Sequence, residues 1–366
     1  MALLLSYFLS LFLITLFSFS LVDPNLTLVN HPVWENFRNF MVNLGYNKRE
    51  LSSVIYVMVI AILFIFHFLF INRYKIYTPL TIAAIIGITT LIAYPFLSHD
   101  FFNYIFDAKI LTFYWKNPYF TKALDFPNDP WIRFMHWTHR TYPYGPSFLA
   151  LTLIPSALAL GKFVLNYIFF KIMFLFFYLL SAFSLFKIKR QTAIYFITSP
   201  LVIIEGLINS HNELFAVGIA LFGIYLIQKK KNIIWGRLCF FISAGIKYMS
   251  LPVIFISKNE KIDRLSLVGL ILLIGYYSIT KEIQPWYFLN LLIFLPFYPK
   301  LINSFNIFFA GLMLSYYPYI RFGQWDNPNN VNYKHLIILF FLGLNLSILY
   351  FENKKRYDQK NSSIFQ

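Results

Sequence analysis

The chain has 366 residues, of which 58% are apolar and only 13% are charged. A soluble globular protein carries about 25% charged residues, so this composition excludes an ordinary soluble domain, a disordered chain and a disulfide-rich secreted scaffold. Apolar runs of roughly 18 residues or more recur along the whole length, which predicts an all-α polytopic membrane protein. The net charge of +16 is expected to mark cytoplasmic loops that face anionic lipid, and no nucleic-acid partner is expected.

The predicted transmembrane bundle has about 10–12 spans. Residues 1–22 have no basic residue at their start and no small-residue cleavage site, so they are interpreted as an anchored helix and not as a removed signal peptide. No repeat or linker divides the chain, and residues 1–366 are therefore expected to form a single integral membrane domain. Two segments, 147–161 and 233–257, are ambiguous. The other predicted spans are 52–72, 79–97, 163–186, 191–208, 213–228, 265–280, 285–299, 301–320 and 335–350.

The short loops that are rich in Lys and Arg set the predicted orientation. If they lie in the cytoplasm, the long polar segment 98–146 lies outside as a partly helical loop. This orientation requires that 147–161 does not cross the membrane. As a helix, its 15 or so residues reach only about 22 Å, whereas the hydrocarbon core of a bilayer is about 30 Å thick. A short full span is the competing interpretation. Segment 233–257 is then expected to enter the membrane and return, turning near Gly245–Tyr248.

Polar residues that carry chemistry concentrate in the outer segment 98–146. If residues 100–114 are helical, two carboxylates lie about 10 Å apart on one face of an otherwise apolar helix. This pattern favours a functional site over a solvent-exposed helix face. A solvent-exposed face would carry more charged residues and a wider mixture of residue types. The single cysteine, Cys239, lies in an apolar run and suggests no thiol chemistry. The residues on the polar face, at i, i+3, i+4 and i+7, are Asp100, Asn103, Tyr104 and Asp107.

Three blocks resemble the membrane-embedded GT-C glycosyltransferases. The first block contains Ser98-His99-Asp100, Tyr104, Asp107, Asn117-Pro118-Tyr119 and the turn Tyr142-Pro143-Tyr144-Gly145-Pro146. The second contains Ser199-Pro200, Glu205-Gly206 and Asn209-Ser210-His211-Asn212-Glu213, and the third is Gly245-Ile246-Lys247-Tyr248. The likeness is greatest to the bacterial and archaeal mannosyltransferase-like branch that uses polyprenyl-phosphate sugars. The sequence departs from that branch in the spacing of the Tyr-Pro turn and in having Ser199 and Glu213 where Asn and Asp are usual.

The resemblance implies transfer of a hexose, with mannose expected, from a polyprenyl-phosphate carrier at the outer face, usually with inversion. Inversion needs a base that deprotonates the acceptor hydroxyl, and Asp100 is the candidate because it matches the first acidic position of the family. Asp107 is expected to orient the acceptor or to contact a divalent cation. Whether a cation such as Mg²⁺ or Mn²⁺ binds at Asp100 and Asp107 is left open. The acceptor is equally open: a glycolipid, a cell-surface glycan or a protein.

Other polar residues are expected to hold the donor phosphate and the sugars. Lys247 is the most informative of them, since a lysine within an apolar segment costs about 2.5–3.5 kcal/mol on insertion scales. Lys247 could instead snorkel to the interface or pair with Glu205. The complete set of expected substrate-binding residues is Tyr104, Asn117, Tyr119, Arg140, Tyr142, Tyr144, Glu205, His211, Asn212, Glu213, Lys247, Gln284 and Trp286.

Three other functions are compatible with parts of the pattern. A secondary transporter would use buried charges as a pathway, but it predicts two related halves and leaves the long outer loop unexplained. A structural or assembly protein predicts small-residue packing stripes and no polar constellation. A lipid-linked polysaccharide ligase or polymerase would also place basic residues beside lipid phosphates. The predicted location is the cell membrane, with the active site on the extracytoplasmic face.

Overall fold

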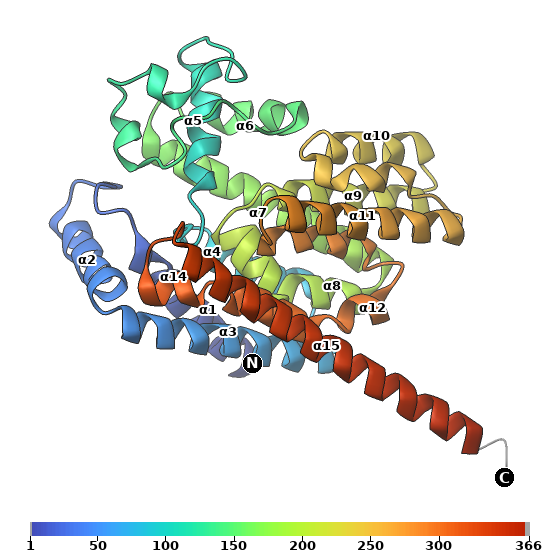
Figure 1. The fold of residues 1–366 in the computed structure, drawn as a ribbon. Coiled ribbons are helices and arrows are strands. Elements are labelled where there is room, and N and C mark those ends of the chain that lie inside the picture. Colours follow the sequence, from blue (N-terminus) through green and yellow to red (C-terminus); the bar gives the residue numbers. More distant parts are fainter. Residues whose placement is uncertain (1, 363–366) are drawn as a thin grey trace.

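The computed structural model describes residues 2–362, and every regular element in this range is a helix (Figure 1). The predicted polytopic helical bundle is confirmed. Five of the described helices are long and apolar enough to cross a bilayer. They are α1 (Ala2–Phe17, continued by the 3₁₀ turn Ser18–Leu21), α3 (Arg49–Asn72), α7 (Phe163–Ile188), α11 (Glu260–Thr280) and α15 (Pro328–Ser362).

A sixth candidate span consists of two helices, α8 (Arg190–Thr198) and η5 (Val202–Ile208), which meet at a bend of 67°. The bend lies at Ser199-Pro200. Proline supplies no backbone N–H and disfavours a helical conformation in the residue before it, and Ser199 is accordingly extended (ψ 123°). After the bend, η5 is a π-helix, a form that is often found at functional sites.

The remaining apolar helices are shorter than a full span. They are α4 (Pro79–Thr90), α6 (Pro146–Leu158), α9 (Glu213–Gln228), α10 (Ile233–Ala244) and η7 (Pro285–Phe294). Besides 191–208, which is bent, three further predicted spans are wrong as continuous helices. In segment 79–97 the helix ends at Thr90. Segment 285–299 is a 3₁₀ helix that ends at Phe294. Segment 301–320 is divided among three short helices. These helices are α12 (Pro299–Asn303), α13 (Asn306–Leu314) and α14 (Tyr317–Phe322).

The predicted return of segment 233–257 is confirmed. Helix α10 and the 3₁₀ helix η6 (Tyr248–Phe255) form a hairpin, in which Arg237 donates to the carbonyl of Ile254 near its base. Its tip packs against the start of α6, where the amide of Gly145 donates to the carbonyl of Ile246 (3.1 Å). A Cβ at Gly145 would overlap the carbonyl of Gly245, so this approach requires glycine.

The ends of the helices gather into two groups. At one end, Arg190 donates to the carbonyl of Tyr77 (2.9 Å), and Gln228, Lys258 and Tyr298 line a common cavity. This end carries the basic loops. At the other end, which holds the polar clusters, Arg321 pairs with Glu50 and the amide of Leu97 donates to Asn209 (3.2 Å).

Helix α6 has 13 residues, fewer than a full span needs, and near its end Ser156 hydrogen-bonds Thr112 of α5 (2.8 Å). After α6, Phe163 at the start of α7 packs against Phe134 of the outer loop, with 4.7 Å between ring centroids. In that loop lie α5 (Asp100–Thr112) and two 3₁₀ turns, Ala123–Asp125 and Pro130–Phe134. A buried ion pair between Lys109 and Asp129 closes the loop on α5, and Lys109 lies 3.6 Å from the centroid of the Trp131 ring.

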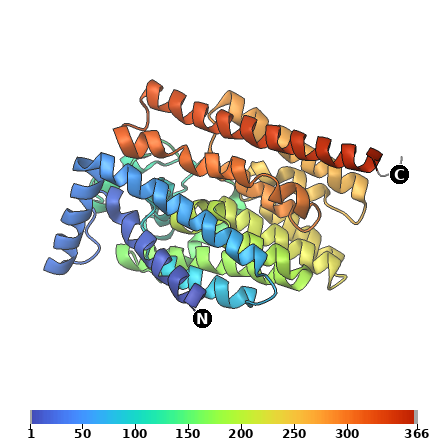
Figure 2. The same ribbon diagram turned by 90° about the horizontal axis from the view of Figure 1, so that it is seen from below.

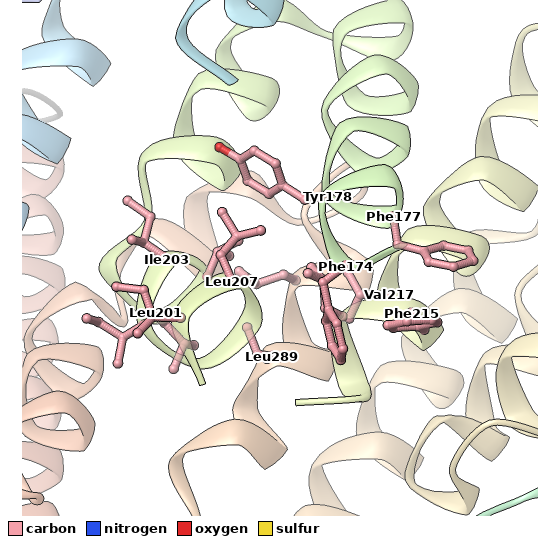
Figure 3. Packing of buried hydrophobic residues seen from close by; sticks show 14 of the residues in the cluster. Phe174, Phe177, Tyr178, Leu201, Ile203, Leu207, Phe215, Val217 and Leu289 are labelled. Atoms are coloured by element: carbon pink, nitrogen blue, oxygen red, sulfur yellow. The ribbon is translucent and has the colours of Figure 1, made fainter. Parts of the chain in front are cut away.

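Buried aromatic and aliphatic side chains from most of the helices form one core, and Figure 3 shows the part around Phe174, Leu207 and Phe215. Phe215 contacts Phe174 and Phe177 at ring-centroid distances of 4.6 and 4.4 Å. Truncating such a buried ring to alanine costs about 3–5 kcal/mol. By contrast α15 lies along the outside of the bundle and extends beyond it (Figure 2). An outer amphipathic helix that the sequence analysis did not assign, α2 (Pro32–Val42), connects α1 to α3.

Candidate functional site

A cavity of about 460 Å³ opens at the polar end of the bundle. Its volume lies within the range of about 300–1,000 Å³ that small-molecule sites occupy. Four parts of the chain build it: the start of α5, residues 136–140 of the outer loop, the segment leading into η7, and the loop after α14. The polar and aromatic residues that line it are Ser98, His99, Asp100, His136, Trp137, Arg140, Glu282, Gln284, Trp286, Tyr319, Trp325 and Asp326.

Asp100 is the first residue of α5, and its carboxylate lies in this cavity with 18% of the side chain exposed. The positive end of the helix dipole favours a carboxylate at this position. One carboxylate oxygen accepts a hydrogen bond from the guanidinium of Arg140 (3.2 Å). The other oxygen faces Nδ1 of His211 at 3.9 Å. Asp100 therefore combines access to a substrate with fixed positive and polar neighbours.

Behind Asp100 lies a buried polar pair, His211 and Glu205, both with fully buried side chains. Their atoms Nε2 and Oε2 are 3.3 Å apart, and Asn209 donates to the same carboxylate oxygen (3.2 Å). The ring of Trp286 stacks on His211 with 4.1 Å between centroids and an angle of 17°. The arrangement places Asp100, His211 and Glu205 in one line that leads from the cavity into the protein.

The turn that carries His211 is held by a buried lysine that the sequence analysis did not single out. Nζ of Lys171 donates to the carbonyls of Leu207 (3.1 Å) and Ile208 (2.8 Å) and to the hydroxyl of Ser210 (2.8 Å). These carbonyls end η5, where no helical N–H follows to bond them, and the Ser210 hydroxyl also donates to that of Leu207 (3.0 Å). Ser210 itself has a φ of +59°, a strained value for a non-glycine residue. In the sequence, a lysine within the apolar predicted span 163–186 was the signal that could have pointed to this role.

Lys247, at the tip of the hairpin, forms an ion pair with Glu213 and not with Glu205. The ammonium also lies 5.4 Å from the centroid of the Tyr287 ring. Glu213 is fully buried and, like Lys247, is not among the residues that line the cavity. This pair locks the hairpin to the start of α9 beside the site.

Asp107 lies on the same helix as Asp100 but does not line the cavity. Its side chain is buried, and burial, together with the nearby charge of Asp100, raises the pKa of Asp107 to about 8, although Arg140 acts in the opposite direction. Asp107 is therefore mostly protonated at neutral pH. An uncharged carboxyl does not act as a base, so the geometry and the protonation state favour Asp100 for that role.

Several predicted substrate-binding residues of the outer loop do not line the cavity and instead contact one another. Tyr104 packs edge-on against Tyr144, with 5.1 Å between centroids. Tyr119 donates to the carbonyl of Tyr144 (3.2 Å), and Tyr142 donates to that of Gly145 (3.3 Å). Asn117 accepts from the amide of Tyr119 in a turn (2.9 Å). The amide group of Asn212 is buried without a hydrogen-bond partner, but Asn212 does not line the cavity.

The far wall of the cavity comes from the C-terminal third, which matched no family pattern. Lys334 of α15 is 5% exposed and donates to Glu282 (2.7 Å) and to Gln284 (2.8 Å). It also lies 4.9 Å from the ring centroid of Trp325. Glu282 and Lys334 were not predicted, although a lysine directly before the last apolar run was a signal. Among residues 2–362 no group of three or more His, Cys, Asp or Glu side chains is placed to hold a metal ion.

The chain was compared with known protein families, curated proteins and solved structures. Residues 9–257 match the MptA_B family, described as alpha-(1→6)-mannopyranosyltransferase, N-terminal domain. No curated protein and no solved structure matches the chain. The matched range contains Asp100, Glu205, His211 and Lys247, whereas the Glu282–Asp326 wall lies beyond it. Because the match spans more than half of the chain, the protein belongs to the MptA_B family of alpha-(1→6)-mannopyranosyltransferases, which confirms the predicted mannosyltransferase resemblance.

Proposed function

We propose that this protein is a GT-C mannosyltransferase that moves mannose from a polyprenyl-phosphate carrier to a hydroxyl of a glycan, glycolipid or protein acceptor, with inversion. The observation that carries the proposal is the position of Asp100. In a chain of a mannosyltransferase family, this carboxylate opens into a cavity large enough for a sugar and is held by Arg140 and His211. The family match supports transferase chemistry and gives no support to a transporter.

The proposed reaction is a displacement at C1 of mannose, coupled to the transfer of one proton. The acceptor oxygen attacks C1 of the mannosyl group as the bond between C1 and the phosphate oxygen breaks. The acceptor proton passes to Asp100, and the electron pair of the broken bond leaves with the polyprenyl phosphate. Positive groups near the departing phosphate favour this step, and Arg140 supplies one in the cavity wall. Among residues 2–362 no His, Cys, Asp or Glu cluster is placed to hold a divalent cation, so the proposed step uses none, and an unchanged rate in EDTA is expected.

We infer that the cavity opens to the extracytoplasmic side. The basic loops around Arg190 and Lys258 lie at the opposite end of the bundle. Lys and Arg in short loops are retained in the cytoplasm. A polyprenyl-phosphate donor is consistent with this side, because the carrier lipid itself delivers the sugar to the outer leaflet.

The decisive experiment compares wild type with Asp100→Asn in proteoliposomes, using mannosyl-phosphoryl-undecaprenol as donor. Asparagine keeps the size of the side chain and removes the base. The rate of undecaprenyl phosphate release is expected to fall about 100-fold or more. Asp125→Asn is the matched control: Asp125 belongs to the same outer loop, is exposed and lies outside the cavity. Its rate should equal that of wild type.

Other outcomes would redirect the proposal. Equal rates for wild type and Asp100→Asn would exclude Asp100 as the base. Wild-type protein that uses guanosine diphosphate mannose and not the lipid-linked sugar would overturn the polyprenyl-phosphate donor. If no mannose moves but preassembled lipid-linked glycan is transferred, the ligase or polymerase function takes its place.

A further inference from the structure

Lys171 lies within α7, a helix long and apolar enough to cross a bilayer, and is only 2% exposed. An ionisable residue at such a position is costly and usually has a function. Two other lysines near the site, Lys247 and Lys334, pair with the carboxylates of Glu213 and Glu282. In the part of the chain that the structure describes, Lys171 has no such partner, and its Nζ bonds to two carbonyls and one hydroxyl. Pairing with a carboxylate therefore does not explain this lysine.

Lys171 contacts both elements that carry the polar residues behind the cavity. Its Nζ lies 5.1 Å from the ring centroid of Phe101, the residue that follows Asp100 on α5. Phe101 is fully buried, which fixes this contact. The same Nζ holds the carbonyls that end η5 and the hydroxyl of Ser210, the residue before His211. Lys171 thus joins α7, the helix of Asp100 and the turn of His211.

The turn that presents His211 is strained and needs support from outside. Ser210 has a φ of +59°, a left-handed conformation that costs free energy in a residue with a Cβ. Its hydroxyl donates to the carbonyl of Leu207 (3.0 Å) and accepts from Lys171 (2.8 Å). An ammonium has three N–H bonds, and each of them finds an acceptor in or beside this turn. The lysine therefore offsets the strain in the turn that places His211 3.9 Å from Asp100.

We infer that Lys171 is a positioning residue: by holding the turn at Ser210, it keeps His211 against Asp100. The inference rests on the proposed function, in which Asp100 is the base. Lys171 is not among the residues that line the cavity, so it acts through His211 and not on the substrate. Its loss should lower kcat, because a displacement of about 1 Å can cost about 100-fold in rate. The KM for the donor should stay nearly unchanged.

Lys171→Met removes the donor and keeps a side chain of similar length. Its kcat, measured well below the Tm of every variant, is expected to fall about 10-fold or more, with KM within about two-fold of wild type. Tyr178→Phe is the matched control on the same helix. Tyr178 is fully buried and donates to the carbonyl of Ile197 (2.9 Å), which is not part of the turn. This control also loses a buried hydrogen bond from α7 to a backbone carbonyl, so it should lower Tm and leave kcat nearly unchanged.

Glycine at position 210 provides a rescue. Glycine adopts a positive φ without the strain that a Cβ brings, so the turn needs less support in Ser210→Gly. The double variant Lys171→Met/Ser210→Gly is expected to recover most of the lost kcat. If Lys171 only stabilised the fold, kcat per folded molecule would not change in any of these variants.

Amide hydrogen exchange reports on the turn without any substrate. In wild type two amides of the turn bond back to carbonyls of η5 at 2.8 and 2.9 Å, so they should exchange slowly. Lys171→Met should speed exchange in peptides that cover residues 204–213, and the double variant should slow it again. Tyr178→Phe should leave exchange in these peptides unchanged.

Three results overturn the inference: unchanged kcat in Lys171→Met, an equal loss of kcat in Tyr178→Phe, or no recovery of kcat and of slow exchange when Ser210→Gly is added. If Lys171→Met does not fold, Ser210→Val takes its place, because a β-branched side chain strains the same turn with the lysine intact. Unchanged kcat in that variant would equally overturn the inference. Failure of wild type to consume the donor would instead count against the proposed function, and hydrogen exchange then decides the role of Lys171 by itself.

Discussion

Asp100 and Asp107 lie two turns apart on one helix, yet their surroundings give them different chemistry. Asp100 is partly exposed in the cavity and holds Arg140 by a hydrogen bond. Asp107 is enclosed, and a buried carboxyl favours its neutral form because charge is poorly solvated there. The spacing of the sequence placed both on the same face but could not distinguish them, since burial depends on what packs against the helix.

The raised pKa of Asp107 predicts a pH dependence of stability. In the unfolded chain the carboxyl loses its proton near the ordinary aspartate pKa of 3.8, and in the folded protein it does so near pH 8. The folded state therefore binds more protons between these values, and stability should fall as the pH rises from about 4 to 8. Asp107→Asn should remove this fall and raise Tm by several degrees at pH 8, with little change near pH 4. Thermal unfolding in detergent measures it, and a Tm difference that is the same at both pH values would contradict the assignment.

At the scale of elements, interruptions in the helices build the site. After the bend at Ser199-Pro200, η5 carries Glu205 against His211, and His211 in the next turn faces Asp100. The hairpin of α10 and η6 brings Lys247 to Glu213. Pro200 and the short lengths of these segments are visible in the sequence. Their partners are not, because Lys171 and Lys334 reach the site from helices that the sequence analysis treated as ordinary spans.

The contact between α15 and the segment before η7 can be tested by a double-mutant cycle. Lys334→Met leaves the carboxylate of Glu282, which is 25% exposed, without its counter-charge. It should lower Tm by a few degrees and raise the donor KM, because Glu282 and Gln284 line the cavity. Adding Glu282→Gln should restore much of the lost Tm. Strictly additive Tm effects of the two changes would show that the pair is not coupled.

For the whole molecule, the two ends of the bundle differ in charge and in content. One end collects basic loops and the other collects the cavity, the outer loop and the aromatic residues around it. Several predicted spans are broken or short, as the segments of α4 and η7 are. Cys239 is the one cysteine of the chain, so Cys239→Ala gives a cysteine-free background. Single cysteines introduced into it allow the orientation to be measured.

In that background, Lys116→Cys reports on the outer loop and Lys230→Cys on a basic loop. Both positions are exposed. A maleimide that does not cross membranes should label Lys116→Cys in intact cells, and Lys230→Cys only after the cells are permeabilised. The opposite pattern would reverse the orientation and place the site in the cytoplasm.

The sequence by itself determined the helical class, the long outer segment, the face with Asp100 and the mannosyltransferase blocks. These features depend on local composition and spacing, which a single chain displays directly. Tertiary structure alone decided that His211 lies between Asp100 and Glu205, that Lys247 pairs with Glu213, and that residues from Glu282 to Asp326 complete the cavity. Such pairings join residues far apart in the chain, as Asp100 and His211 are, and helix periodicity constrains neighbours only a few residues away.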